Sequence, residues 1–282
     1  MRWEPAPVVN GKVHMRAVRY VAINVFRESV RDRVPYNLVL FAVLLIASSY
    51  LLGQLTAGQD VKIIKDLGLA ATSIFGLFIA VFIGIGLVSK EVERRSIYAL
   101  LSKPVSRAQF IAGKYAGLVL TLAVNVAVMT LALYAVLGYM SWTESAQFKA
   151  GWETPAVDPA LMKALLLIFV ELMLVTAIAV FFSTFSSPIL SAAMTFGLYV
   201  AGHFNADLRN FDKVVESKTA ATLARAVYHV LPDFAAFDVK TQVVHGLHVP
   251  ATYLATTIGY GVAYIAALLL AATFIFSRRD FK

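Results

Sequence analysis

The sequence predicts an all-α polytopic membrane protein with six transmembrane helices. Hydrophobic residues make up 59% of the 282 residues and charged residues only 15%, which is too apolar for one soluble core. The apolar residues fall into six runs, and most runs reach the ~20 residues that a helix needs to cross ~30 Å of hydrocarbon. We therefore treat residues 1–282 as a single transmembrane domain. The expected spans are about 36–55, 67–88, 115–138, 164–183, 188–202 and 252–276.

The Lys and Arg residues indicate which ends of the spans face the cytoplasm. If the N-terminus is cytoplasmic, the segments on that side hold 16 of the 25 Lys and Arg residues. Cytoplasmic loops carry such an excess, so we expect both termini in the cytoplasm and the chain in the cell inner (plasma) membrane. The formal net charge of +8 then reflects topology and contact with the lipid bilayer, and we expect no nucleic-acid partner.

Residues 15–33 precede the first span and show helical spacing of apolar side chains. We expect an N-terminal interfacial helix that lies on the inner leaflet and ends before Pro35. A solvated juxtamembrane helix is the alternative. The apolar face would consist of Val18, Val21, Ala22, Val25 and Phe26, and the opposite face of Arg16, Arg27 and Arg31.

The segment 89–114 between the second and third spans contains six Lys or Arg residues in 26 positions. Its first part should form a short helix that ends near Lys103, because Pro104 disfavours helical backbone in the residue before it. Ser106 followed by Gln109 has the form of a capping box, which predicts that a second helix starts there and continues into the third span. The sequence thus predicts a helix, a proline corner and another helix below the membrane.

The later spans carry signs of close packing. Residues 184–187 separate the fourth and fifth spans, which predicts a tight hairpin with Pro188 in the first turn of the returning helix. The loop 203–251 between spans five and six should be a helical, extracytoplasmic loop, with Asp233 as a helix cap. Small residues recur every four positions in two spans and predict helix contacts. They are Gly76, Ala80 and Gly84 in the second span, and Ala255, Gly259, Ala263, Ala267 and Ala271 in the sixth.

Glu171 lies inside the fourth span, where a lone carboxylate is costly. We expect it to be protonated, or paired with Asn125 or a hydroxyl group. Both a functional role and a structural hydrogen bond between spans fit this position. His245 and His248 offer two imidazoles in the outer loop, but the chain has no cysteine, and we expect no metal site.

One segment, SKEVERRSIYALLSKPVSRAQFIAGKYAGL at 89–118, resembles the signature of type-2 ATP-binding cassette (ABC) transporter permeases. LPDFAAFDVK at 231–240 and IFSRRDFK at 275–282 are similar to the outer loop and the C-terminus of one subgroup, the permeases of multicopper-enzyme maturation and gliding motility. With the six spans, the resemblance covers nearly the whole chain. The matching positions of the signature are Glu91, Leu100, Leu101, Ser102, Pro104, Val105, Ser106, Arg107, Gly113 and Lys114.

The resemblance implies a transmembrane subunit that has no catalytic residues and no cofactor of its own. ATP and Mg²⁺ would be bound by a separate ABC ATPase subunit, and this sequence contains no G-x-x-x-x-G-K-[ST] phosphate loop. The helix within 89–114 would be a cytoplasmic coupling helix that inserts into a groove of that ATPase. The alternative is that its charges only flank a membrane helix. The implied ATPase-coupling residues are Glu91, Glu93, Arg94, Arg95, Ile97, Tyr98, Leu101, Lys103, Pro104, Ser106, Arg107 and Lys114.

The same resemblance implies a permease subunit that couples ATP hydrolysis to export or to force transmission across the membrane. Six spans are half of the number that such transporters use, so a second copy or a sibling permease should complete the unit. An extracytoplasmic protein partner could contact the outer loop. A non-transporting membrane scaffold of an envelope complex is an alternative. An ion-coupled secondary transporter is another, although that class usually has several intramembrane charges and this sequence offers Glu171 alone.

Overall fold

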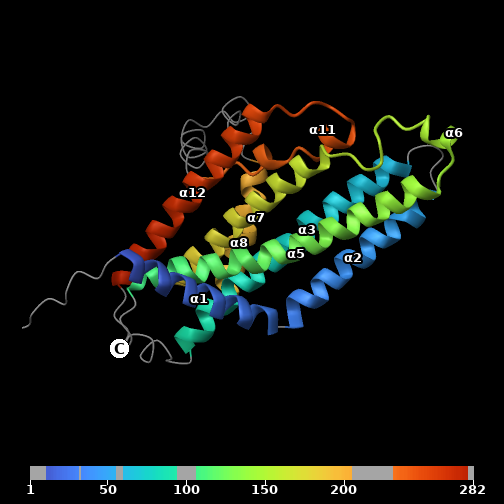
Figure 1. Ribbon diagram of the computed structural model, residues 1–282. Coiled ribbons are helices and arrows are strands. Elements are labelled where there is room, and N and C mark those ends of the chain that lie inside the picture. The colour runs from blue at the N-terminus through green and yellow to red at the C-terminus, as the bar shows by residue number, and fades with distance from the viewer. Residues whose placement is uncertain (1–10, 32, 55–59, 94–105, 205–230, 279–282) are drawn as a thin grey trace, which may run out of the picture.

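The computed structural model describes residues 11–31, 33–54, 60–93, 106–204 and 231–278. These residues form a bundle of helices (Figure 1), and no β-strand occurs among them. The expectation of an all-helical membrane protein is confirmed for this part of the chain.

Five of the helices are long and apolar enough to cross a membrane. They are α2 (Arg33–Gln54), α3 (Asp60–Glu93), α5 (Arg107–Thr143), α7 (Leu161–Ser183) and α12 (Ala251–Arg278). The other helices are α1 (Gly11–Arg31), α6 (Ala146–Lys149), α8 (Pro188–His203), the 3₁₀ turn η2 (Ala235–Phe237) and α11 (Lys240–Val244). The count of six spans stays a prediction, because the fifth expected span is the 16-residue helix α8.

Helix α7 lies at the centre of the bundle. In its most apolar stretch 78% of the residues are buried, compared with 22% in α2 and 17% in α12. It contacts α3, α5, α8 and α12. A Cβ atom added to Gly76 of α3 would lie 2.4 Å from Leu172 of α7, and one added to Gly84 would lie 2.7 Å from Ala179. The small residues of the second span therefore make the close helix contact that the sequence predicts.

The corresponding prediction for the sixth span is wrong within this chain. Ala255, Gly259, Ala263 and Ala267 are exposed on α12. The buried stripe begins two residues later, on the other side of the helix, and includes Ile265. This buried stripe faces α7 and α5, which are the helices that α12 contacts. The buried residues of α12 are Thr257, Gly261, Ile265, Ala272 and Phe276.

Helix α1 packs along the first part of α5. Two glycines of α5 allow this, because a Cβ atom on Gly113 would lie 2.7 Å from Val21 and one on Gly117 would lie 2.6 Å from the backbone oxygen of Ala22. Figure 1 shows α1 and the C-terminal end of α12 at one end of the bundle, with α6 and α11 at the other. Both described ends of the chain therefore lie on the same side, as the expected topology requires.

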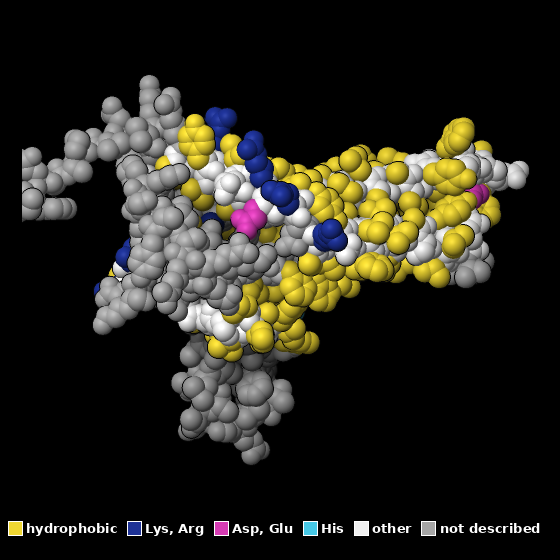
Figure 2. Space-filling model, turned by 90° about the horizontal axis from the view of Figure 1, so that it is seen from below, with side chains coloured by type: hydrophobic (Ala, Val, Ile, Leu, Met, Phe, Trp, Pro, Cys, Tyr) yellow, Lys and Arg dark blue, Asp and Glu magenta, His cyan; other side chains and the backbone are white. Residues whose placement is uncertain are grey.

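The surface divides into a basic end and a hydrophobic flank. Figure 2 shows Lys and Arg side chains gathered toward the end where α1 lies, and hydrophobic side chains over the long flank. Arg19, Arg27 and Arg31 of α1 and Arg33 of α2 are all exposed. This pattern fits a helix at a membrane surface beside spans that face lipid. A helix is present at Gly11–Arg31, whereas α2 already begins at Arg33 and contains Pro35, and the interfacial location of α1 stays a prediction.

Candidate functional site

The proline corner after α3 is where the sequence places the ATPase contacts. The structure does not describe the side chains of most candidate residues, which are those from Glu91 to Pro104. Ser106, Arg107 and Lys114 are described, and all three belong to the start of α5 or to its N-cap.

Ser106 begins α5 through the expected capping box. Its backbone is extended, its hydroxyl oxygen accepts a hydrogen bond from the backbone N–H of Gln109 at 3.3 Å, and its own N–H donates to Gln109 Oε1 at 2.8 Å. The prediction from the Ser106 and Gln109 spacing is confirmed. The box satisfies two donors at the exposed start of a 37-residue helix and so fixes where the corner ends.

Arg107 joins the start of α5 to the end of α12. Its Nη1 donates hydrogen bonds to the carbonyl oxygens of Phe276 at 2.9 Å and Ser277 at 2.6 Å. The rings of Phe110 and Phe276 stack beside this contact with centroids 5.9 Å apart. A cation at a helix C-terminus binds carbonyls that have no partner within the helix and opposes the negative end of its dipole. Arg107 therefore holds α5 and α12 together at this end of the bundle, and we call this contact the joint at Arg107.

Lys114 lies inside this end of the bundle. Its side chain has 0% exposure, and its ammonium nitrogen lies 4.7 Å from the centroid of the Phe110 ring. In this conformation a side chain without exposed surface cannot contact another protein. The structure thus places Lys114 in the packing of α5, whereas Ser106 is exposed.

The second candidate feature is a polar cluster around Glu171 in the middle of α7. Glu171 is 2% exposed, and its Oε1 lies 3.6 Å from Nε2 of His203 at the end of α8. The Tyr199 hydroxyl, one turn earlier in α8, lies near Glu171 and near Ser73 of α3. Three helices thus bring polar side chains to one buried position.

The expected pairing of Glu171 with Asn125 is not what the structure shows. The Asn125 amide donates to the carbonyl oxygen of Thr121 on its own helix at 2.7 Å. The alternative of a hydroxyl partner stays a prediction, and the nearby Tyr199 is its candidate. His203 was missed because the expected fifth span ended at 202, although its spacing of four residues from Tyr199 placed both on one face of a helix.

Residues 231–239 lie deep against the helices on the α11 side of this cluster. The N–H of Phe234 donates to the carbonyl oxygen of Gly202 at 3.2 Å, and the N–H of Asp233 donates to the Tyr260 hydroxyl at 2.9 Å. Tyr260 is the tenth residue of α12, about 14 Å along the helix from its start. Asp233 does not cap a helix as expected, since η2 starts after Phe234 and has no side-chain cap.

The connection between α5 and α7 is fixed to α3 by a buried lysine. Lys65 Nζ donates to Thr154 Oγ1 at 2.8 Å and to the carbonyl oxygen of Pro155 at 2.9 Å, and it lies 3.8 Å from Asp158. Its side chain is fully buried. Lys65 precedes the expected second span at 67–88, because α3 starts at Asp60, before the apolar run.

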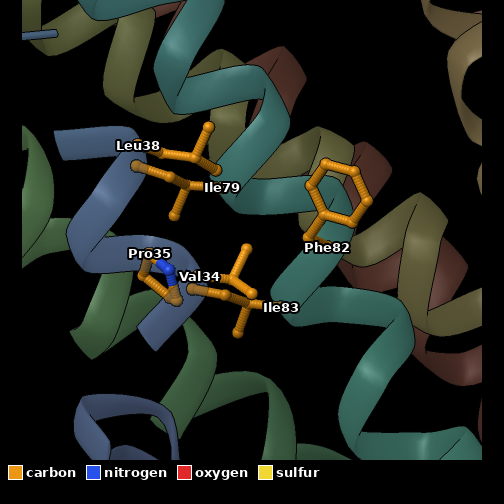
Figure 3. Close-up of a pocket in the computed structure, with 6 residues that line it drawn as sticks. All are labelled: Val34, Pro35, Leu38, Ile79, Phe82 and Ile83. Atoms are coloured by element: carbon orange, nitrogen blue, oxygen red, sulfur yellow. The ribbon is translucent and has the colours of Figure 1, made fainter. Parts of the chain in front are cut away.

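A shallow groove lies between α2 and α3 (Figure 3). Its volume is about 120 Å³, and every lining side chain is apolar. Such a groove can accommodate hydrocarbon and offers no group that would orient a polar molecule. The lining residues are Val34, Pro35, Leu38, Ile79, Phe82 and Ile83.

His245 and His248 are both exposed, next to and beyond the end of α11. Among the described residues, no group of three or more His, Cys, Asp or Glu side chains is placed to hold a metal ion. The polar features that concern us among the described residues are the joint at Arg107 between α5 and α12, the cluster at Glu171 and the bonds of Lys65.

Comparison with protein families gives one match. The family model described as ABC-2 family transporter protein matches residues 19–281. The matched range includes the five helices of the described residues that are long and apolar enough to cross a membrane, the joint at Arg107 and the cluster at Glu171. No match to a curated protein was found.

Proposed function

The chain belongs to the ABC-2 family of transporter proteins and is a multi-pass permease subunit, and we propose that it couples ATP hydrolysis in a separate ATPase subunit to export or to force transmission across the membrane. ATP and Mg²⁺ would be bound by that ATPase. The coupling contacts would come from the segment between α3 and α5, through the residues from Glu91 to Arg107 that match the permease signature.

The joint at Arg107 is the observation that best supports this proposal. A push on the segment before Ser106 reaches α5 directly, because the capping box makes Ser106 the fixed start of that helix. The bonds from Arg107 to Phe276 and Ser277 pass the displacement to α12. The close packing at Gly113 passes it to α1. Three helices would then move as one body when the ATPase moves.

The proposed assembly has two permease subunits above two ATPase subunits in the cell inner membrane. The second permease would be another copy of this chain or a sibling. The N- and C-termini would be cytoplasmic, since exposed arginines gather at the end of the bundle that holds α1. The described residues between 231 and 250 would face the other side, where an extracytoplasmic protein could bind.

Co-purification with the ATPase, followed by an ATPase assay in lipid, tests the proposal. The variant carries Arg94→Glu and Arg95→Glu. We expect it to insert normally, to retain less than a tenth of the bound ATPase and to lose any effect of the permease on ATPase rate. The physical reason is that two cations of the implied coupling helix become anions at the interface.

The matched control carries Arg27→Glu and Arg31→Glu, which changes the charge equally on exposed positions of α1. It should keep the ATPase bound. Undiminished binding in the Arg94 and Arg95 variant would contradict the proposal. Equal loss in both variants would instead assign the effect to overall charge on that face.

A further inference from the structure

Glu171 and His203 face each other between α7 and α8 in the interior of the bundle. The Glu171 side chain is buried, and Oε1 lies 3.6 Å from Nε2 of His203. Within the described part of the chain, Oε1 has no hydrogen-bond partner. A buried acceptor without a partner costs free energy, so the proton count of this pair decides whether the site is stable.

The contact of Nδ1, the other ring nitrogen of His203, limits how many protons the pair can hold. Nδ1 lies 3.1 Å from the backbone carbonyl oxygen of Tyr199. A carbonyl oxygen can only accept a hydrogen bond, so Nδ1 must carry a hydrogen. In a neutral imidazole, Nε2 then presents its lone pair to Glu171.

An ionised Glu171 beside a neutral His203 would place two acceptors against each other. One proton removes this conflict in either position. If the proton is on the carboxyl group, the O–H donates to Nε2, and if it is on the ring, the N–H donates to the carboxylate. A second proton would leave a net positive charge in a buried site, which is costly. The arrangement of Oε1 and Nε2 therefore favours the state in which the pair holds one proton.

The side chains around the pair are polar or carry opposing charges. The Tyr199 hydroxyl of α8 lies near Glu171. Asp238 and Lys240 act on Glu171 through space from the segment after η2, and they lie 3.5 Å apart, so their fields partly cancel. Ser73 of α3 lies near the Tyr199 hydroxyl.

The two other helices that pack on α7 present phenol groups. On α5, the Tyr115 hydroxyl donates to the carbonyl oxygen of Met173 at 3.2 Å. On α12, the Tyr260 hydroxyl accepts the backbone N–H of Asp233.

Residues 231–237 pack against His203 at the end of α8 and leave 29% of its side chain exposed. The His203 ring stacks on Phe234 with centroids 5.8 Å apart and planes at 14°. A Cβ atom on Gly202 would lie 2.5 Å from both the Phe234 ring and the Pro232 carbonyl oxygen, so the segment is in close contact with the helix end. Moving this segment away would uncover more of the His203 ring.

We propose that Glu171 and His203 form a proton-binding site, which holds one proton between Oε1 and Nε2 while residues 231–237 cover the end of α8. Displacement of these residues exposes His203 further, and uptake or release of the proton is then faster. This inference is independent of the coupling to an ATPase.

Infrared and nitrogen NMR spectra of the full chain in lipid nanodiscs test the proton count. From about pH 6 to about pH 8, either the carbonyl band of a protonated carboxyl group or the imidazolium signal of His203 should persist. Glu171→Gln should remove that signal. Glu153→Gln, which changes an exposed carboxylate, should leave it intact. An ionised Glu171 beside a neutral His203 at neutral pH would overturn the proposal.

The pH dependence of the melting temperature, Tm, gives an independent measurement of the proton count. An unfolded chain releases the proton of histidine near pH ~6.5, whereas the folded pair retains it. The folded state then binds one more proton, so the Tm of the wild type should fall relative to Glu171→Gln as the pH rises above about 6.5. Parallel Tm curves would overturn the proposal. If Glu171→Gln does not fold, His203→Gln provides the same comparison.

Hydrogen–deuterium exchange of the site proton tests the link to residues 231–237. Gly202→Ala should displace Phe234 and speed the exchange at least several-fold. Gly197→Ala on the same helix is the control, because a Cβ atom there meets nothing within 4 Å. Equal exchange in the two variants would overturn the link.

Discussion

Arg107 donates a 2.9 Å hydrogen bond to the carbonyl oxygen of Phe276, a residue 169 positions further along the chain. The bond closes the last turn of α12 with a side chain from the first turn of α5. It gives a residue of the permease signature a structural role within the subunit. The joint can be tested separately from any contact with an ATPase.

Arg107→Gln should loosen the C-terminal turn of α12. Bonds from a charged group are worth about 1.5–3 kcal/mol, and because Arg107 is half-buried we expect a loss of about 1.5 kcal/mol in unfolding free energy. Hydrogen exchange should speed up at the last amides of α12. Arg27→Gln on the exposed surface of α1 is the control, and unchanged exchange in α12 of the Arg107 variant would contradict the joint.

Gly117→Ala should separate α1 from α5. The added Cβ atom would lie 2.6 Å from the backbone oxygen of Ala22, which cannot move away by a rotamer change. We expect a loss of about 1–3 kcal/mol and faster exchange throughout α1. Gly138→Ala on the same helix meets nothing within 4 Å and should be neutral or stabilising by up to about 1 kcal/mol. Similar effects of the two variants would refute the close contact.

Lys65→Met should destabilise the connection between α5 and α7. The change leaves Asp158 without its buried cation and Thr154 and Pro155 without their donor. We expect a loss of roughly 3 kcal/mol, measured by thermal unfolding in detergent. Lys62→Met removes a pair whose Glu153 side chain is 60% exposed, so it should cost much less than Lys65→Met. Equal costs would contradict the difference in burial.

The pKa of Glu153 provides a prediction outside the membrane spans. A hydrogen bond from Lys62 holds this pKa below its ordinary value of 4.5, with a smaller contribution from the charge of His245. A lowered pKa stabilises the folded state above the ordinary value, and that stabilisation is lost as the pH falls through the folded-state pKa. In an NMR titration, Lys62→Met should raise the pKa of Glu153. Lys163→Met should leave it unchanged, since Lys163 binds the Val249 carbonyl oxygen.

The features that the sequence predicts best are set by neighbouring residues. The capping box of Ser106 and Gln109 depends on a spacing of three residues, and Pro188 in the first turn of α8 depends on its own ring. Apolar runs likewise placed the long helices, although α3 and α5 extend beyond them. A hydrophobicity pattern marks the part of a helix within hydrocarbon, and the helix itself continues into polar sequence.

The features that the sequence could not predict depend on how helices turn toward each other. The side of α12 that faces inward is set by α7 and α5, so the small-residue stripe containing Gly259 was assigned to the wrong face. The partner of Glu171 is on another helix, and its identity depends on the rotation of α7 against α8. Lys65 is buried because residues 154–158 fold back over it, and no local pattern indicates such a return.

The shortness of α8 has a consequence for biogenesis. Its 16 residues are about 24 Å long, less than the ~30 Å of hydrocarbon. Two acceptors near its end are bound by other groups, the Tyr199 oxygen by His203 and the Gly202 oxygen by Phe234. Phe234 is synthesised about 30 residues after α8 ends, at ~5–20 residues per second. For a few seconds α7 and α8 are therefore inserted without the bond from the Phe234 N–H to the Gly202 oxygen. The insertion machinery must shield that carbonyl group until Phe234 has been synthesised.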